Sequence, residues 1–256
     1  MTPFADGALL RGARTARQVE LRELVGETGL LVLAPHPDDE TLGCGAVLAA
    51  AAAAGREVHV VVITDGGGSH PNSRAWSRTR LAERRRRELE NALEVLGEGR
   101  ITHECLEYPD QDTPLPDDPG MARHLDRLVS VMSARGLDTI LSCWEHDPHV
   151  DHVRCAALAD ILLHRARERL DRHVSLTKYA VWGRFIEAPL SNPTDEELVR
   201  FDTVTAWRAA KERALAHHAT QMTDLIDDDP AGFVMPAIMQ RHFVEHDELF
   251  IRRRAP

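Results

Sequence analysis

Two short stretches of the chain gather histidine and carboxylate side chains. They are residues 36–40 (HPDDE) and residues 144–152 (WEHDPHVDH). Imidazole nitrogens and carboxylate oxygens are ordinary ligands of catalytic zinc, which takes about three protein ligands and keeps one position open for water. A zinc hydrolase also needs a carboxylate that is close to the metal but not bound to it and accepts a proton from that water. If the two stretches meet, they supply groups for both tasks.

Each stretch follows an apolar run that has the length of a buried strand. These runs are residues 30–34 and 139–143, and a third run, residues 58–64, is β-branched and continuous, as in strands buried on both faces. The two prolines in the first stretch bar it from the sheet ladder, and an alanine-rich helix is expected over residues 41–54. Open α/β sheets place their ligand sites at the carboxyl ends of strands. We therefore expect the two stretches to face each other there.

Strand-like and helix-like segments alternate over residues 30–182, which is typical of a sheet wound with helices. We predict an α/β fold with a Rossmann-like, doubly wound, mostly parallel sheet, helices on both faces and the active site at the carboxyl ends of the strands. Residues 1–29 are expected to be an N-terminal extension and residues 30–256 a single domain. Asp147 before Pro148 is a good N-cap pair for the helix that follows. The remaining expected elements are helices over residues 80–96, 121–134, 148–170 and 206–220, and strands over residues 101–106, 178–182 and 249–253.

The overall composition argues against several classes of function. The chain carries 31 basic and 41 acidic residues, a formal net charge of −10, which argues against a surface that tracks nucleic-acid phosphates. Its most apolar stretch, residues 46–54, is too short to span a bilayer, and no signal-peptide pattern is recognised. The four cysteines form no CxxC pair and lie in or beside apolar segments, so we expect buried free thiols in a reducing cytoplasm. Nothing in the sequence indicates an oligomeric state.

Some of these features have competing explanations. Gly43 and Gly45 partly imitate a dinucleotide-binding fingerprint, but the third glycine is missing and a Pro-His-Pro-Asp-Asp segment separates the pair from the strand. The Gly66–Gly68 loop lacks the ending of a phosphate-binding P-loop, so we expect it to shape or cover a cleft. Packing readily explains any single histidine among the 14 in the chain. The two stretches together, at matching strand ends, favour a metal site.

Residues 36–45 read HPDDETLGCG and residues 149–152 read HVDH. They resemble two signatures of the PIG-L/LmbE-like de-N-acetylase family, HPDDExLGxG and HPDH, with valine in place of the usual proline of the second. The resemblance covers about residues 30–221. Weaker likenesses within this range are a helix pattern at residues 85–97, the Pro109-Asp110 pair, and Lys211 together with residues 218–221.

The resemblance implies a metal site built from His36, Asp39 and His152. The implied metal is zinc, although two histidines and one carboxylate are also the facial set used by ferrous iron. Asp38 is implied to be the general base. This role makes physical sense because Asp38 adjoins a ligand yet points elsewhere, so it can accept a proton from water whose pKa the metal lowers to about 7.

Further roles follow from the second motif and from the weaker likenesses. The resemblance implies that His149 stabilises the oxyanion or protonates the leaving amine, since a histidinium there opposes the charge that develops on the carbonyl oxygen. It implies that Asp151 orients His149, as a carboxylate behind a histidine fixes its tautomer. Val150 removes one constraint on this loop. On the substrate side, Asp110 either accepts hydrogen bonds from sugar hydroxyls or serves the loop turn, and Arg85 either reaches the pocket or stays solvated.

The implied activity is the metal-dependent removal of an acetyl group from an N-acetylated amino sugar, N-acetylglucosamine in a larger glycoconjugate. The expected partner is therefore a small molecule. One alternative is a metalloamidase that acts on another acylated small molecule, such as an antibiotic or thiol conjugate. A non-catalytic carbohydrate-binding protein is another, but mere sugar binding needs no general base beside the ligand set. Trp144, Trp182 and Trp207 are candidates for stacking on a sugar, with core packing expected for at least two.

Overall fold

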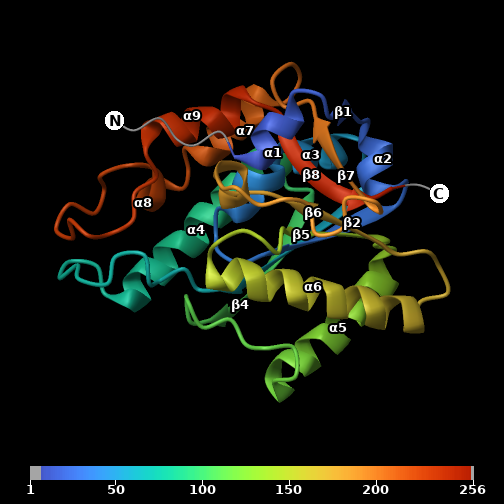
Figure 1. The fold of residues 1–256 in the computed structure, drawn as a ribbon. Coiled ribbons are helices and arrows are strands. Elements are labelled where there is room, and N and C mark those ends of the chain that lie inside the picture. The colour runs from blue at the N-terminus through green and yellow to red at the C-terminus, as the bar shows by residue number, and fades with distance from the viewer. Residues whose placement is uncertain (1–6, 255–256) are drawn as a thin grey trace.

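The computed structural model describes residues 7–254. Over these residues it contains one eight-stranded sheet, with strand order β1-β7-β8-β6-β5-β2-β3-β4, and helices cover both of its faces (Figure 1). The strands are β1 (Arg17–Gln18), β2 (Gly29–Ala34), β3 (Glu57–Thr64), β4 (Ile101–Tyr108), β5 (Thr139–Cys143), β6 (Ser175–Tyr179), β7 (Glu196–Phe201) and β8 (Glu248–Arg253). The helices are α1 (Ala8–Ala13), α2 (Leu21–Val25), α3 (Asp39–Ala53), α4 (Arg78–Gly97), α5 (Pro119–Arg135), α6 (Val150–Arg169), the 3-10 helix η1 (Trp182–Phe185), α7 (Arg208–Leu215), α8 (Ala219–Met222) and α9 (Ala237–Glu245).

The direction of the strands confirms the predicted doubly wound, mostly parallel sheet. Every neighbouring pair runs parallel except the pairs made by β8, which is antiparallel to both β6 and β7. The chain winds outward from β2 in two directions, through β3 and β4 on one side and through β5 and β6 on the other. Such a reversal opens a crevice at the carboxyl ends of the strands, here between β2 and β5.

The layers follow from the apolar runs of the sequence. β2 and β5 are buried along their whole length, as is β3 after its first residue, so these strands need cover on both faces. Helices α5 and α6 pack together on one face, while α3, α4 and α7 pack together on the other (Figure 1). Among residues 7–254, no helix combines the length and the apolar character needed to cross a membrane.

Helix α3 is broken near its start and is held there by a buried ion pair. Cys44 has a non-helical backbone, with φ −144°. Glu248 accepts hydrogen bonds from the two backbone N–H groups at positions 46 and 47, at 2.7 and 3.1 Å, while Lys211 donates to the carbonyl of Leu42 at 2.9 Å. Lys211 Nζ and Glu248 Oε1 are 2.6 Å apart and fully buried. The pair therefore satisfies backbone groups that the break would leave without partners.

Three predicted elements differ from the observed ones. The helix expected to start at Pro148 starts at Val150, and its N-cap is His149, because the Asp147 carboxylate is already occupied by backbone N–H groups that follow β6. The strand expected over residues 178–182 ends at Tyr179. The helix expected over residues 206–220 is two helices, α7 and α8.

The described part of the predicted N-terminal extension joins the main sheet. Within it, β1 pairs in parallel with β7 at the sheet edge, and α1 packs against η1. Residues 1–6 lie outside the described residues. All four cysteines are free; Cys44, Cys143 and Cys155 are buried as predicted, and Cys105 is half-buried.

Candidate metal centre and active site

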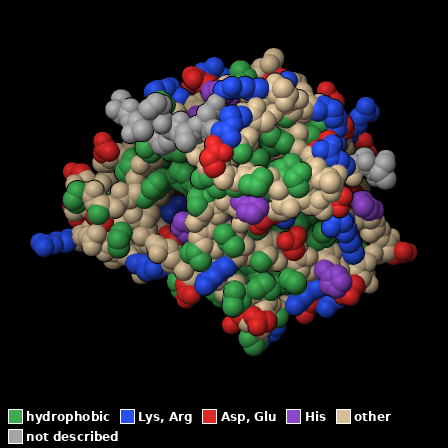
Figure 2. Space-filling model, viewed as in Figure 1, with side chains coloured by type: hydrophobic (Ala, Val, Ile, Leu, Met, Phe, Trp, Pro, Cys, Tyr) green, Lys and Arg blue, Asp and Glu red, His purple; other side chains and the backbone are tan. Residues whose placement is uncertain are grey.

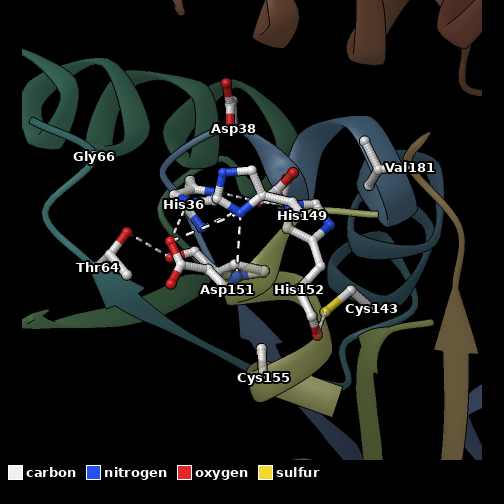
Figure 3. Close-up of polar contacts among 12 residues, drawn as sticks. His36, Asp38, Thr64, Gly66, Cys143, His149, Asp151, His152, Cys155 and Val181 are labelled. Carbon is white, nitrogen blue, oxygen red and sulfur yellow. Dashed lines mark hydrogen bonds and ion pairs between the residues drawn. The ribbon is translucent and has the colours of Figure 1, made fainter. Parts of the chain in front are cut away.

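The loops after β2 and β5 bring the two predicted stretches together at the carboxyl edge of the sheet. His36, Asp38 and Asp39 come from the loop after β2 and the first residue of α3, and His149 and His152 come from the start of α6. The ring centroid of His36 lies 4.7 Å from that of His149 and 5.5 Å from that of His152 (Figure 3). The meeting is possible because β2 and β5 are paired neighbours in the sheet.

His36 has carboxylates at both ring nitrogens. Its Nδ1 is 3.0 Å from Asp39 Oδ2, and its Nε2 is 2.9 Å from Asp151 Oδ2 and 3.3 Å from Asp110 Oδ1. Burial lowers the pKa of the ring, but the hydrogen bonds with Asp110, Asp151 and Asp39 outweigh burial and raise the pKa well above its usual value. Three carboxylates around one imidazole make this a site for positive charge, either a proton or a metal ion.

His152 has one nitrogen fixed by a carboxylate and the other turned toward a second carboxylate. Its Nδ1 donates to Asp147 Oδ2 at 2.9 Å, so the neutral ring carries its lone pair on Nε2. Among the described residues, the buried Nε2 has no hydrogen-bond partner, although Asp39 Oδ2 is 3.2 Å away. Two acceptors that face each other require a cation between them, and a carboxylate behind a histidine is the usual support of a metal ligand. The residues therefore fit a metal ion.

The pKa values of the same residues describe what replaces a metal when none is bound. Burial lowers the pKa of His152, but Asp39 and Asp147 outweigh it and raise the pKa to about 10. Burial raises the pKa of Asp39, but His152 and His36 outweigh it and hold the pKa well below its usual value. Asp39 is thus ionised, as a metal ligand must be, and protons on the imidazoles occupy the place of the cation.

The donors around this point allow more than one set of ligands. His36, His149 and His152 offer nitrogens that all lie within 4.8 Å of one another. Asp39 Oδ2 contacts both His36 and His152. Either Asp39 or His149 can therefore serve as the third ligand beside the rings of His36 and His152. The same distance limit is met by a second, more acidic group: His36, Asp110, His149 and Asp151.

Asp38 lies beside these donors in a strained conformation. Its backbone φ of 146° is a value that residues other than glycine rarely adopt, and adopting it costs roughly 1–3 kcal/mol. Arg85 Nη2 is 3.1 Å from Asp38 Oδ2 and 2.9 Å from the carbonyl of Pro37, and Arg85 Nη1 donates to the carbonyl of Gly66 at 2.8 Å. Arg85 is only 3% exposed, so it is not solvated, and it fixes the carboxylate and the loops on either side.

The environment of Asp38 also changes its acidity. Burial raises the pKa of the carboxyl; Arg85 partly offsets this, and the neighbouring Asp39 charge adds to it, which leaves the pKa of Asp38 at about 6. A carboxylate with a pKa near the working pH is well suited to general base catalysis.

Asp151 meets His149 through its backbone rather than through its carboxylate. Its N–H donates to His149 Nδ1 at 3.2 Å, whereas Asp151 Oδ2 is 3.8 Å from that nitrogen. The carboxylate instead contacts His36 and accepts hydrogen bonds from the backbone N–H groups of Gln111 and Thr113, at 2.7 and 3.1 Å. The peptide N–H of Asp151, rather than its carboxylate, therefore orients His149. The carboxylate is already hydrogen-bonded to the loop after β4.

His149 is half-buried and borders the cavity. Burial lowers its pKa, and the neighbouring His36 and His152 lower it further. Because Nδ1 accepts the Asp151 N–H, a neutral ring carries its proton on Nε2. His149 is therefore arranged to donate a hydrogen bond from Nε2.

Asp110 takes part in the turn of its loop and also borders the cavity. Its Oδ2 accepts a hydrogen bond from the N–H of Gly68 at 3.0 Å, which ties the loop after β4 to the loop after β3. Its Oδ1 faces His36, and its side chain borders the cavity. Asp110 thus shapes the loop and remains available to a ligand.

The site opens into a cavity of about 490 Å³. A second cavity of about 730 Å³ lies beside α9 and is lined by none of these residues, so the smaller one is the relevant space. Figure 2 shows this side of the molecule, with hydrophobic side chains gathered beside its hollow. Among the residues that border the smaller cavity are His36, Asp38, His149, Trp182, Gln221 and Phe233.

Three residues at the site had no site role assigned to them from the sequence. Asp147 belongs to the second stretch but was expected to cap a helix, and Gln221 belongs to a weaker family likeness. Phe233 lies between two helices without any motif, so nothing in the sequence singled it out. Conversely, His146 of the second stretch points to Ser191, with Nε2 2.9 Å from its Oγ, and is not among the residues that line the cavity.

Comparison with known proteins places this site in a family. The sequence profile described as PIG-L: GlcNAc-PI de-N-acetylase matches residues 31–163, slightly more than half of the chain. The chain belongs to the PIG-L family. The matched range contains both stretches, residues 36–40 and 144–152, and all of the strands β2 to β5 except the first two residues of β2. The predicted family is therefore confirmed.

Solved structures share the fold of this PIG-L protein. N,N′-diacetylchitobiose deacetylase from Pyrococcus horikoshii is 21% identical with a TM-score of 0.63, over 89% of this chain and 84% of that chain. The zinc-inhibited form of teicoplanin deacetylase Orf2 is 20% identical with a TM-score of 0.61, over 89% and 99%. GalB, a 4-carboxy-2-hydroxymuconate hydratase from Pseudomonas putida, is 16% identical with a TM-score of 0.63, over 90% and 97%. Because a hydratase shares the fold, the reaction must be argued from the site itself.

Proposed function

We propose that this protein is a metal-dependent hydrolase that removes the acetyl group from an N-acetylated amino sugar of the N-acetylglucosamine type, carried in a glycoconjugate. The observation that carries the proposal is the pairing of His152 Nε2 with Asp39 across a gap that suits a cation, beside Asp38, whose backbone is strained. Membership of the PIG-L family supports the same reaction, and the deacetylases among the fold neighbours are consistent with it.

His36, Asp39 and His152 would hold the metal. This set of two imidazoles and one carboxylate suits zinc, and ferrous iron uses the same set. When bound, the metal would polarise the acetyl carbonyl and lower the pKa of a neighbouring water molecule. The Asp147 carboxylate would keep His152 in the tautomer that presents Nε2.

Asp38 would act as the general base. It accepts a proton from the water molecule that attacks the acetyl carbonyl, and Arg85 keeps the carboxylate in place. A pKa of about 6 leaves Asp38 ionised at neutral pH and still basic enough to take that proton. Arg85 is thus assigned to the base rather than to direct recognition of the sugar, which falls to Asp110.

His149 would assist the collapse of the tetrahedral intermediate. Its Nε2–H donates a hydrogen bond to the negative charge on the former carbonyl oxygen, and the proton that Asp38 accepted from water passes to the leaving nitrogen. The C–N bond breaks, and the products are acetate and the free amine. Asp151 supports this step by orienting His149 through its N–H and by holding His36 through its carboxylate.

Two substitutions separate the roles of base and ligand. Asp38→Asn should abolish acetate release while the metal content stays near that of the wild type. His152→Ala should lose the metal as well as the activity. His146→Ala is a matched control, because this histidine belongs to the same stretch but is bonded to Ser191. Wild-type turnover by Asp38→Asn would disprove the assignment of the base.

A substrate panel distinguishes the proposed reaction from its alternatives. Acetate release from N-acetylglucosamine conjugates supports the amino-sugar reaction, whereas release only from acylated antibiotics or thiol conjugates favours a different metalloamidase. Binding of glycans without hydrolysis would favour a carbohydrate-binding protein. The measurement is the amount of acetate and free amine formed by the metal-loaded wild-type protein.

A further inference from the structure

Apolar side chains, two aromatic rings among them, form part of the wall of the active-site cavity. Trp182 and Phe233 are both half-buried, and their ring centroids are 5.7 Å apart at an interplanar angle of 85°. Pro71, Ala231 and Met235 border the same cavity. When a ligand covers partly exposed aromatic rings in a cleft, the free energy falls because apolar surface is removed from water.

Trp182 is linked to the proposed metal ligand His152 through one shared carboxylate, that of Asp147. The backbone N–H of Trp182 donates to Asp147 Oδ2 at 3.2 Å, and the same oxygen accepts the hydrogen bond from His152 Nδ1 at 2.9 Å. The N–H of Gly183 also donates to this carboxylate. The turn that carries the indole therefore has a fixed place relative to the reacting groups.

Phe233 is held by contacts between two long loops. The N–H of Phe233 donates to the carbonyl of Ser69 at 2.8 Å. Earlier in the same loop, Asp229 accepts the N–H of Asn72 at 2.7 Å, and Asp228 accepts the hydroxyl of Ser73 at 2.6 Å. These loops follow β3 and α8, and Figure 1 shows them together at one end of the molecule. The backbone that carries Phe233 is thus tied to the loop after β3.

The chemistry of this wall selects an apolar occupant. The side chains of Pro71, Ala231, Phe233 and Met235 carry no hydrogen-bond donor, so an apolar group placed against them loses no hydrogen bond to water, whereas each sugar hydroxyl placed there needs a polar partner. The polar lining residues nearest to these side chains are Ser69 and Gln221, and Gln221 Nε2 already donates a hydrogen bond to Ser69 Oγ at 3.0 Å. A cavity of about 490 Å³ is in the range that takes drug-sized ligands, which leaves room beyond one acetamido group.

We propose that the Trp182–Phe233 pair is a subsite for an apolar, ring-containing aglycone attached to the amino sugar. This inference rests on the proposed function, because it assumes that the acetamido group of the same molecule lies at His36 and Asp38. The natural substrate is then an amphiphilic glycoside rather than a free sugar or an oligosaccharide.

Binding to three probes tests the subsite. The probes are N-acetylglucosamine, N,N′-diacetylchitobiose and 4-nitrophenyl N-acetyl-β-glucosaminide, measured by calorimetry on metal-loaded Asp38→Asn protein so that turnover does not interfere. The aryl glycoside should bind roughly tenfold more tightly than the free sugar, the ratio expected for one well-placed apolar group. Phe233→Ala should abolish this preference and leave binding of the free sugar within about twofold of the parent.

Two further variants test whether the effect of Phe233→Ala is specific to the apolar wall. Leu225→Ala alters an exposed apolar side chain that shares the loop of Phe233 but does not line the cavity, and it should change nothing. Ala231→Asp places a charge on the apolar wall at an exposed position that tolerates substitution, and it should weaken binding of the aryl glycoside alone. Equal loss of affinity for all probes in Phe233→Ala would mean that the ring is only structural.

The remaining outcomes separate the subsite from the proposed reaction. Equal affinity for the aryl glycoside and the free sugar, or preference for the disaccharide, would overturn the subsite even if the wild type releases acetate. Aryl preference that depends on Phe233, without acetate release by the wild type, would support the subsite and reject the proposed deacetylation.

Discussion

Asp147 links the metal centre to the wall of the cavity, and its removal should disturb both. The residue is fully buried. Its carboxylate accepts hydrogen bonds from His152 Nδ1 and from the backbone N–H groups of Val181, Trp182 and Gly183. Asp147→Ala therefore leaves four donors, three of them buried, without this acceptor.

The size of the effect follows from these contacts. Each buried donor left without a partner costs about 1–3 kcal/mol, and water that enters the vacated space can satisfy some of them. If two donors remain unsatisfied, the free energy of unfolding falls by about 2–6 kcal/mol. Loss of a carboxylate behind a metal-bound histidine weakens metal affinity by about 10–100-fold, or about 1.4–2.8 kcal/mol.

Two assays measure these losses separately. Denaturant unfolding gives the stability of the metal-free protein, and competition with a chelator gives the affinity for zinc. Glu145→Ala is a matched control, because Glu145 lies in the same loop and pairs with Lys178 at 2.9 Å outside the cavity lining. Zinc affinity of Asp147→Ala equal to that of the wild type would refute the role given to this carboxylate.

Three further perturbations probe the base and its supporting fold. Asp38 must be ionised to accept a proton and its pKa is about 6, so kcat/KM should fall as the pH drops below about 6. A bound metal dication should move the midpoint of this fall to lower pH. A midpoint above pH 7 would contradict the role of Asp38 as the base. Lys211→Met should lower the free energy of unfolding by about 3–5 kcal/mol, because it leaves the Glu248 carboxylate buried without its cation; Glu248→Gln in the same chain should restore part of the loss in denaturant unfolding. Gly43→Ala should cost about 1–3 kcal/mol in the same assay, because its Cβ would overlap the ring of Tyr179; unchanged stability would show that the ring moves freely.

The parts of the fold that the sequence predicts are those encoded by local pattern. The apolar runs that became β2, β3 and β5 are continuous, and their strands are buried on both faces. His36 and His152 were placed at one edge of the sheet because parallel strands share their carboxyl edge. Local pattern and that one topological rule therefore suffice to locate the chemistry.

The parts that could not be predicted depend on contacts between distant segments. Asp147 looks like a helix cap in its own sequence, but N–H groups more than 30 residues later occupy it. Arg85 sits in a run of arginines on α4, and only the loops after β2 and β3 bury it against Asp38. Phe233 reaches the cavity because its backbone N–H is hydrogen-bonded to the carbonyl of Ser69. No periodicity in the sequence indicates this contact.

Acetate release by metal-free and metal-restored protein tests the central proposal most directly. The protein is stripped with a chelator, its metal content is measured, and hydrolysis of an N-acetylglucosamine glycoside is followed before and after zinc or ferrous iron is added. Activity should fall to background on stripping and return with one of the two metals, while Asp38→Asn stays inactive although it binds that metal. Full activity in the stripped protein would contradict the proposal.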